Sequence, residues 1–410
     1  MTSAPENKIK VGFVGLSATT GWAATTLAPA LIQPNLRENY DLVAVSTTSE
    51  ASAKASADKY SQDIGHPIAA YFGDASNIVS DPDVDLVAVS VKAPHHKEIV
   101  LKVIEAKKDF FVEWPAGTST KETEEIAAAA HKQGVRSFVG LQGRHAVVIQ
   151  KVKELLASGV IGTIRSTNVV SSSLVERLLT PQSMIHNFVL VQIAHLPKEA
   201  HFYSPFNKEN NAYLLEKKNG LRPLSMTIGI RVTMLTIVVG HQLDTLTHVL
   251  GDFSSVTATN AQLYPTVIIV DDTGKPTGKT FKSQSPDHFA ITGVLKTGIL
   301  ANIFWRAGYS SNEGRRQYVW EIEGEEGSIR LQSDHLLGAL PSMFESELYL
   351  NGKKVEFETP GNGIVTVSGA WKEFASRTPG TYATIEDAVK HHRLLDAIEA
   401  SAKEGKRIIL

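Results

Sequence analysis

Cysteine is absent from this sequence. Disulfide bonds and thiolate metal sites are therefore excluded, because both require cysteine sulfur. Proteins of reducing compartments do without disulfides, so the absence favours an intracellular protein. Residues 1–8 are polar and contain no apolar core of a secretory signal. We expect a cytoplasmic location, with the nucleus as the alternative.

The sequence also lacks a long hydrophobic run and an excess of either charge. Its most apolar stretch, residues 187–196, is shorter than the about 20 residues that cross a bilayer, so no membrane association is expected. The 41 basic and 43 acidic residues give a formal net charge of -2, which provides no basic stripe for a polyanion. Direct nucleic-acid binding is not expected.

The sequence also lacks histidines at the spacing that is typical of a metal site. Among the 14 histidines, the adjacent pairs His95-His96 and His391-His392 are the closest groupings. Side chains of neighbouring residues on a helix diverge by about 100°, so such pairs do not converge on one ion. No metal site is expected.

The chain has 410 residues, which is enough for two domains, and from residue 8 it alternates short apolar strands with helical segments. Strand signals cover 10–16, 41–46, 85–91, 110–113 and 137–141, and helix signals cover 22–32, 50–60, 96–106 and 121–134. This alternation is typical of a doubly wound parallel sheet with helices on both faces. Residues 8–143 are therefore predicted to form a Rossmann domain.

The pattern changes after residue 143. An amphipathic helix is predicted at 146–158, and strand signals follow at 163–170, 254–263, 266–270, 288–295, 299–305, 318–323, 328–331 and 348–350. Short turns between several of them favour an open antiparallel sheet with helices. Residues 144–410 are predicted to be a second domain for substrate or partner binding and oligomerisation. Its terminal helix, 385–403, is expected to pack back on the first domain.

The first strand ends in a glycine-containing turn that leads directly into a helix. The residues expected to contact a pyrophosphate there are Gly15, Leu16, Ser17, Thr20, Gly21 and Trp22. Backbone N–H groups and the helix dipole at such a terminus attract an anion, and glycine lets the backbone approach it closely. Ser17 stands where the second glycine of the dinucleotide fingerprint is usual, and an ordinary strand-to-helix turn is the alternative.

The end of the second strand normally reports which nicotinamide cofactor binds. It reads Ser46-Thr47-Thr48, with neither a carboxylate for the ribose 2′-hydroxyl nor an adjacent arginine for a 2′-phosphate. Ser46 and Thr47 are expected cofactor contacts, and the cofactor is NAD or NADP.

Several short segments, in order along nearly the whole chain, resemble one family. They are VGFVGL with GWA near the start, FVEW at 111–114, LQGR at 141–144, GHQLDTL at 240–246, PDH at 286–288, and the helix with His392. They resemble the glucose/fructose oxidoreductase, inositol dehydrogenase and rhizopine-catabolism (Gfo/Idh/MocA) family, and within it the branch of yeast galactose regulatory proteins.

The resemblance implies a nicotinamide over the edge of the parallel sheet and a sugar between the domains. It also implies that Pro94 and His95 or His96 line the dinucleotide and that Glu113 lies beside the ribose. For the two histidines a solvated helix start is the alternative. Trp114, Gln142 and Arg144 complete the expected cofactor contacts, and Arg144 has a surface role as its alternative.

The family's active members use a lysine in a Glu-Lys-Pro turn to take the hydroxyl proton, and here the turn is Glu113-Trp114-Pro115. An indole is only a donor and cannot act as a base, although it can stack on a sugar or a nicotinamide. His241 with Asp244 three residues later is the remaining catalytic candidate. A structural histidine at a helix start, with Asp244 as its partner, is the alternative.

Two hypotheses of function follow. The first is an NAD(P)-dependent oxidoreductase that transfers a hydride from a sugar or polyol. The second is a catalytically silent, dinucleotide-binding transcription regulator that binds an activator peptide.

Either form is expected to be a homodimer. The aromatic pairs Phe304-Trp305 or Tyr318-Trp320 are expected on the sheet face shared by the two copies, with a place in the core as the alternative. Segments 174–195 and 221–232 interrupt the family pattern and are either insertions or translated introns.

Overall fold

The structure is a computed structural model. It describes residues 8–174, 206–208, 233–270, 276–309, 316–335, 338–340, 346–358, 363–377 and 380–410. The chain divides into two compact units, Met1–His145 with Gly363–Lys390 and Ala146–Asn362 with His391–Leu410. The sequence placed all of 144–410 in the second domain. The return of 363–390 to the first unit corrects that boundary, and its cause is the aromatic packing described below.

A six-stranded parallel sheet forms the centre of the first unit, as predicted, in the order β3-β2-β1-β4-β5-β6. Its strands are β1 (Ile9–Val14), β2 (Tyr40–Thr47), β3 (Ala69–Phe72), β4 (Leu86–Val89), β5 (Asp109–Val112) and β6 (Ser137–Val139). All four residues of β4 are buried, which explains its continuous apolar sequence. The strand order reverses between β1 and β4, and a crevice for ligands opens at such a point beyond the carboxyl ends of the strands.

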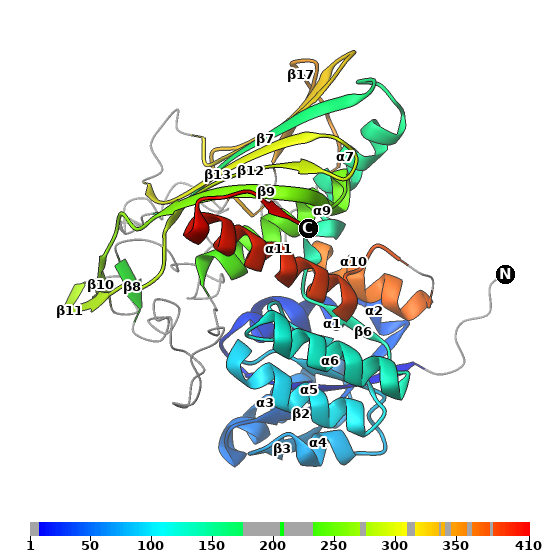
Figure 1. Ribbon diagram of the computed structural model, residues 1–410. Coiled ribbons are helices and arrows are strands. Elements are labelled where there is room, and N and C mark those ends of the chain that lie inside the picture. Colours follow the sequence, from blue (N-terminus) through cyan, green and yellow to red (C-terminus); the bar gives the residue numbers. More distant parts are fainter. Residues whose placement is uncertain are drawn as a thin grey trace, which may run out of the picture. The chain divides into compact units, whose positions relative to one another are not determined.

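Helices connect these strands and cover the sheet (Figure 1). They are η1 (Ala23–Leu27), α1 (Ala28–Leu31), α2 (Pro34–Arg37), α3 (Glu50–Ile64), α4 (Ser76–Ser80), η2 (Ala93–His95), α5 (His96–Glu105), α6 (Thr120–Gln133), η3 (Gln142–His145), α10 (Gly363–Ser376) and the start of α11 (Ile385–Glu404). The local signals for α6 were correct. Ser119 accepts the N–H of Glu122 at its start, and Gly134 ends it with a φ of +66°.

Helix α10 joins the first unit through aromatic side chains. The rings of Phe138 and Phe374 stack with centroids 4.6 Å apart, and Trp371 meets Phe138 edge-on at 4.9 Å. The Tyr40 hydroxyl donates to the Trp371 carbonyl over 2.7 Å. Burial of several aromatic rings in one cluster outweighs the entropy of closing a long loop, which grows slowly with loop length. That packing brings residues far along the chain back to the Rossmann sheet.

The second unit is built on a nine-stranded sheet in the order β17-β16-β15-β14-β7-β13-β12-β9-β18. Its strands are β7 (Ile164–Leu174), β9 (Phe253–Ala261), β12 (His288–Leu295), β13 (Leu300–Tyr309), β14 (Tyr318–Gly324), β15 (Ser328–Ser333), β16 (Glu347–Leu350), β17 (Lys353–Lys354) and β18 (Ile408–Ile409). The pairing of β7 with β13 is parallel and the others are antiparallel. The sheet is therefore mostly antiparallel and mixed.

Two helices of the second unit, α7 (Val147–Ala157) and α9 (Gly240–Leu250), lie on one face of this sheet (Figure 1). η6 (Leu235–Val239) leads into α9. A separate three-stranded sheet contains β8 (Phe206–Lys208), β10 (Thr266–Val270) and β11 (Pro276–Lys282).

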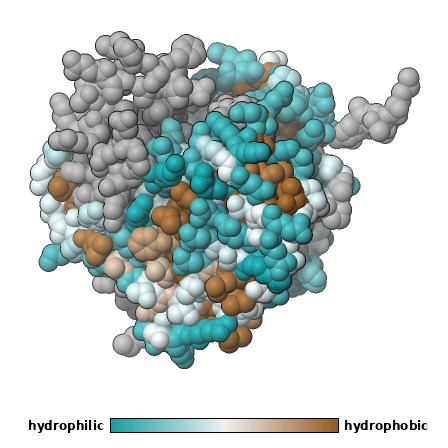
Figure 2. Space-filling view, turned by 90° about the horizontal axis from the view of Figure 1, so that it is seen from above, coloured by the Kyte–Doolittle hydropathy of each residue, from teal (hydrophilic) through white to brown (hydrophobic). Residues whose placement is uncertain are grey.

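The aromatic residues of the nine-stranded sheet divide between its two faces. Trp305, Tyr318 and Trp320 are buried, so of the two predicted places, an exposed sheet face or the core, they occupy the core. Phe304 alternates with Trp305 along β13 and is 38% exposed, and Leu300 on the same face is 56% exposed. In Figure 2, the hydrophobic residues of the visible face occur in small groups among hydrophilic ones.

The two interrupting segments, 174–195 and 221–232, lie outside the described residues, apart from Leu174 at the end of β7. Among the helices that the structure describes, none has both the length and the apolar content to span a bilayer.

Candidate functional site

The first turn of the Rossmann unit begins at Gly15. Its φ is +91°, and a Cβ added there would overlap the carbonyl oxygen of Ser90, beyond β4. The Gly15 N–H donates to the Ser46 carbonyl over 2.9 Å. Only glycine satisfies both the conformation and the close approach, so the turn lies tightly between the ends of β2 and β4.

Ser17 organises the turn from within. Its hydroxyl oxygen accepts the N–H groups of Thr19 at 3.2 Å and Thr20 at 3.3 Å. Gly21 follows with a φ of +94°, and a Cβ added there would have no atom within 4 Å, so the chain is open beside it. Leu16 is buried in the core and can meet a ligand only through its backbone. The serine thus replaces the second fingerprint glycine with a local hydrogen-bonded turn.

The end of β2 carries hydroxyl groups that bond among themselves. Ser46 is buried, and the Thr47 hydroxyl donates to the Ser49 carbonyl over 3.2 Å. Ser49 and Ser52 then form the capping box of α3. These contacts add no charge to distinguish NAD from NADP.

The two histidines after β4 have different surroundings. Pro94 and His95 are exposed in η2, while His96 is buried. The His96 ring nitrogens lie 2.9 Å from the carbonyl oxygens of Pro115 and Val91, and burial lowers its pKa. Its ring therefore ties the turn after β4 to the turn after β5, so the alternative of a solvated helix start is wrong for His96. The contacts of Pro94, His95 and His96 with a dinucleotide stay predictions.

Glu113, directly after β5, is the most perturbed carboxyl near the turn. Its Oε1 accepts the Trp22 indole N–H over 2.9 Å, and burial raises its pKa to about 8 against the hydrogen bonds from Trp22 and the Trp114 backbone. A Cβ at Gly140 would overlap its Oε2. Trp22 was expected to contact pyrophosphate, but its indole N–H is directed to this carboxyl.

The other expected contacts follow β5 and β6. Trp114 is 5% exposed and precedes a cis proline. Gln142 is buried, and its Oε1 has no hydrogen-bond partner in the described part of the chain. A buried amide oxygen without a donor is costly, so this atom is suited to a ligand N–H or O–H.

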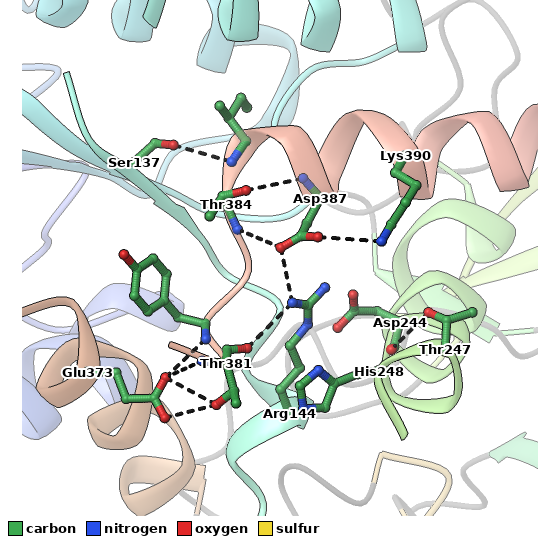
Figure 3. Close-up of polar contacts among 12 residues, drawn as sticks. Ser137, Arg144, Asp244, Thr247, His248, Glu373, Thr381, Thr384, Asp387 and Lys390 are labelled. Carbon is green, nitrogen blue, oxygen red and sulfur yellow. Dashed lines mark hydrogen bonds and ion pairs between the residues drawn. The ribbon is translucent and has the colours of Figure 1, made fainter. Parts of the chain in front are cut away.

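Arg144 has a structural partner instead (Figure 3). Its Nη1 lies 3.2 Å from an oxygen of Asp387 and 3.4 Å from the Thr381 carbonyl. Asp387 also accepts the Thr384 N–H, at the start of α11. The buried guanidinium thus fastens the returning segment to η3, which corrects the expected surface role, and its contact with a cofactor stays a prediction.

In the second unit, His241 and Asp244 lie on the first turn of α9. Asp244 is buried and its charge acts to raise the His241 pKa, but burial prevails and lowers that pKa to about 4. His391 of α11 donates from Nε2 to the Gly240 carbonyl over 2.8 Å, since a carbonyl can only accept. His241 is therefore neutral at physiological pH and its helix start is anchored.

Sequence reasoning missed three supporting residues, Gly140, Asp387 and His391. Thr384 and Asp387 have the spacing of a capping box, and the Asp387 N–H donates to the Thr384 hydroxyl, so that signal was available. Gly140 and His391 act through residues distant in sequence. No group of three or more potential metal ligands occurs among the residues that the structure describes.

Comparison with known proteins adds a family to this geometry. The profile of an oxidoreductase family with an NAD-binding Rossmann fold matches residues 9–141, and that of the Gal80p C-terminal domain matches 147–333. Dehydrogenase aclE of Aspergillus oryzae is 30% identical over 404 residues, which cover 97% of each chain. The galactose/lactose metabolism regulatory protein GAL80 of Saccharomyces cerevisiae is 25% identical over 363 residues, covering 87% of this chain and 73% of that protein.

A solved structure agrees with these matches at the level of the fold. A super-repressor mutant of Gal80p from Saccharomyces cerevisiae superposes with a TM-score of 0.77 at 22% identity, over 98% of both chains. The chain therefore belongs to the Gfo/Idh/MocA family of NAD-binding oxidoreductases, and it has Gal80 regulators among its relatives.

Proposed function

We propose that the chain binds NAD or NADP at residues 15–22 and oxidises a sugar or polyol by hydride transfer. The fit of a dinucleotide rests on the open backbone beside Gly21, the Glu113 carboxyl, and the unsatisfied buried oxygen of Gln142. The chemistry of these groups suits phosphate, ribose hydroxyl and carboxamide groups respectively. The nicotinamide, when bound, supplies the hydride acceptor.

The catalytic part rests on the placement of His241 and a buried Asp244 together on the first turn of α9, where the carboxylate acts on the imidazole. A carbinol loses its hydroxyl proton as the hydride leaves, and a neutral imidazole within hydrogen-bond reach can take that proton. The nearby carboxylate stabilises the imidazolium that forms. The full-length similarity to a dehydrogenase supports this function.

Trp114 favours a second candidate, a catalytically silent regulator that binds a dinucleotide and an activator peptide. The indole occupies the lysine position of the family's active turn and cannot accept a proton. A pKa of about 4 also makes His241 a weak base, because a general base works best with a pKa near the operating pH. The cytoplasmic or nuclear location remains a prediction for either function.

One experiment distinguishes the two. The purified protein is mixed with NAD or NADP and a panel of sugars and polyols, and both the melting temperature and the absorbance of reduced nicotinamide are followed. Stabilisation with turnover that is lost in His241→Gln supports the dehydrogenase. Stabilisation by a dinucleotide without turnover supports the regulator, and no stabilisation by either dinucleotide refutes both.

We also propose that the chain forms a homodimer through the exposed face of the nine-stranded sheet. Leu300 and Phe304 flank Asn302 on that face of β13, and the Asn302 amide donates to Asn168 of β7 over 2.8 Å. Burial of two large apolar side chains at a symmetric contact favours association. Light scattering should report twice the chain mass, and Phe304→Asp should shift the protein to monomers. A monomeric wild-type protein would exclude the proposal.

A further inference from the structure

The hydrogen bond between Trp22 and Glu113 spans the point where the strand order reverses. Trp22 begins the helix after β1, and Glu113 follows β5, while β4 lies between these two strands in the sheet. The indole N–H and Oε1 are 2.9 Å apart across the end of β4. A dinucleotide on this sheet lies at that same reversal point. The bond therefore lies where a bound dinucleotide would pass.

The contacts of the Glu113 carboxyl suit its ionised form. It accepts the Trp22 indole N–H and the Trp114 backbone N–H, and the described residues offer it no other hydrogen bond. A carboxylate is purely an acceptor, whereas a protonated carboxyl needs an acceptor for its own O–H. Burial alone opposes ionisation, and it raises the pKa to about 8. One more hydrogen-bond donor to the Glu113 carboxyl would favour its ionised form over its protonated form.

Two basic side chains of the first unit have partners of their own. The His96 ring bonds to the carbonyls of Val91 and Pro115, and the Arg144 guanidinium pairs with Asp387. At Gly140 the chain presents bare backbone, because any side chain there would overlap the carboxyl. The absence of a side chain at Gly140 thus leaves room for the Glu113 carboxyl in the position that it occupies.

We propose that Trp22 is a positioning residue that holds the Glu113 carboxyl for the ribose hydroxyls of a nicotinamide dinucleotide, and that dinucleotide binding releases the Glu113 proton. The proposal rests on the proposed dinucleotide function. A ribose diol brings two O–H donors, and their hydrogen bonds favour the carboxylate over the acid. Binding and deprotonation are then linked, so each strengthens with the other.

The linkage fixes the direction of the pH dependence. Below pH 8 the free protein carries the proton, so affinity should rise about tenfold per pH unit as the pH increases towards 8 and level off above it. At pH 7 a group with a pKa of about 8 is about nine-tenths protonated. About 0.9 proton should therefore be released for each dinucleotide bound.

Isothermal titration calorimetry measures this number directly. NAD and NADP are each titrated into the full chain at pH 7 in PIPES and in Tris, whose ionisation enthalpies differ, and again at pH 9.5. The expected result is about 0.9 proton released at pH 7 and about none at pH 9.5. Binding without proton release at pH 7 would overturn the inference and leave the dinucleotide function standing. Absence of binding by both would overturn the two together.

Two variants test whether the released proton comes from Glu113 and whether the Trp22 indole positions that carboxyl. Glu113→Gln keeps an amide oxygen for Trp22 but should release no proton, and unchanged release would assign it elsewhere and refute the proposal. Trp22→Phe loses a bond that favours the carboxylate, so the midpoint of the affinity rise should move above pH 8. A purely structural role would lower the melting temperature without moving that midpoint.

Trp320→Phe is the matched control. It also removes one indole hydrogen bond, to the Thr167 hydroxyl in the second unit, over 2.8 Å. It should leave the number of released protons and the midpoint unchanged. A midpoint that moves equally in Trp22→Phe and Trp320→Phe would show a general loss of packing and would refute the positioning role of Trp22.

Discussion

At the scale of single residues, substitutions at Gly15 and Gly21 distinguish the cost of steric overlap from the cost of backbone strain. Both have a φ above +90°, but a Cβ at Gly15 would overlap the Ser90 carbonyl, whereas a Cβ at Gly21 would meet no atom. Gly21→Ala should lower the free energy of unfolding by about 1 kcal/mol, from strain alone. Gly15→Ala should lower it by about 3 kcal/mol, because the backbone must also move. Urea denaturation measures both, and equal losses would contradict the geometry.

The second prediction at this scale concerns His241 and pH. Its pKa is about 4 in the folded protein, below the usual 6.5, so between these values the unfolded chain binds more protons. Stability should therefore rise with pH from about 4 to 6.5 and be fully present above that range. His241→Gln should flatten this part of the profile in urea denaturation at several pH values. An unchanged slope would mean that His241 titrates normally.

At the scale of elements, α10 is the piece that completes the first unit. Phe374 is fully buried and stacks on Phe138, while Lys372 on the same helix is exposed. Phe374→Ala should lower the free energy of unfolding by about 3 to 5 kcal/mol through lost burial and a cavity. Lys372→Ala is the control and should change it by less than about 0.5 kcal/mol. Chemical denaturation followed by circular dichroism compares the two variants, and similar losses would argue against the packing described.

At the scale of the whole molecule, the first unit is discontinuous in sequence. A fragment of residues 1–145 leaves the surface under Trp371 and Phe374 uncovered, so it should aggregate or expose apolar surface. A fusion of 1–145 to 363–390 through a flexible Gly/Ser linker should be soluble and show a cooperative thermal transition. Binding of a hydrophobic dye and calorimetry report the two properties. A cooperative transition in the 1–145 fragment alone would show that α10 is dispensable.

Much of the first unit could be predicted because its signals are local. Strand β4 is continuous and apolar because both of its faces are covered, and Ser119 and Gly134 mark the ends of α6 through their own backbone contacts. The parallel pair of β7 and β13 escaped prediction, since strand direction depends on how the long segment between them is routed, and a periodic pattern is the same in either direction.

The conformation of the first turn was predictable, and the partners of the other site residues were less so. Gly15 has the positive φ and the close backbone approach that its place between a strand and a helix predicted, while Glu113 was singled out through the family resemblance. The hydrogen-bond and ion-pair partners of His96 and Arg144 were not predicted. The His96 ring is bonded to two carbonyls and the Arg144 charge to Asp387, and such partners lie on loops that the sequence does not place together.

By itself the sequence determined the strand and helix alternation, the strained glycine turn and the absence of thiol chemistry, because these depend on side-chain type and near neighbours. The tertiary structure alone decided the Trp22 contact with Glu113, which joins residues 91 positions apart, and the return of α10 to the Rossmann sheet. Burial gives Glu113 its raised pKa and His241 its lowered one. Loss of water from around a charge follows from the whole packed fold, and no local pattern encodes it.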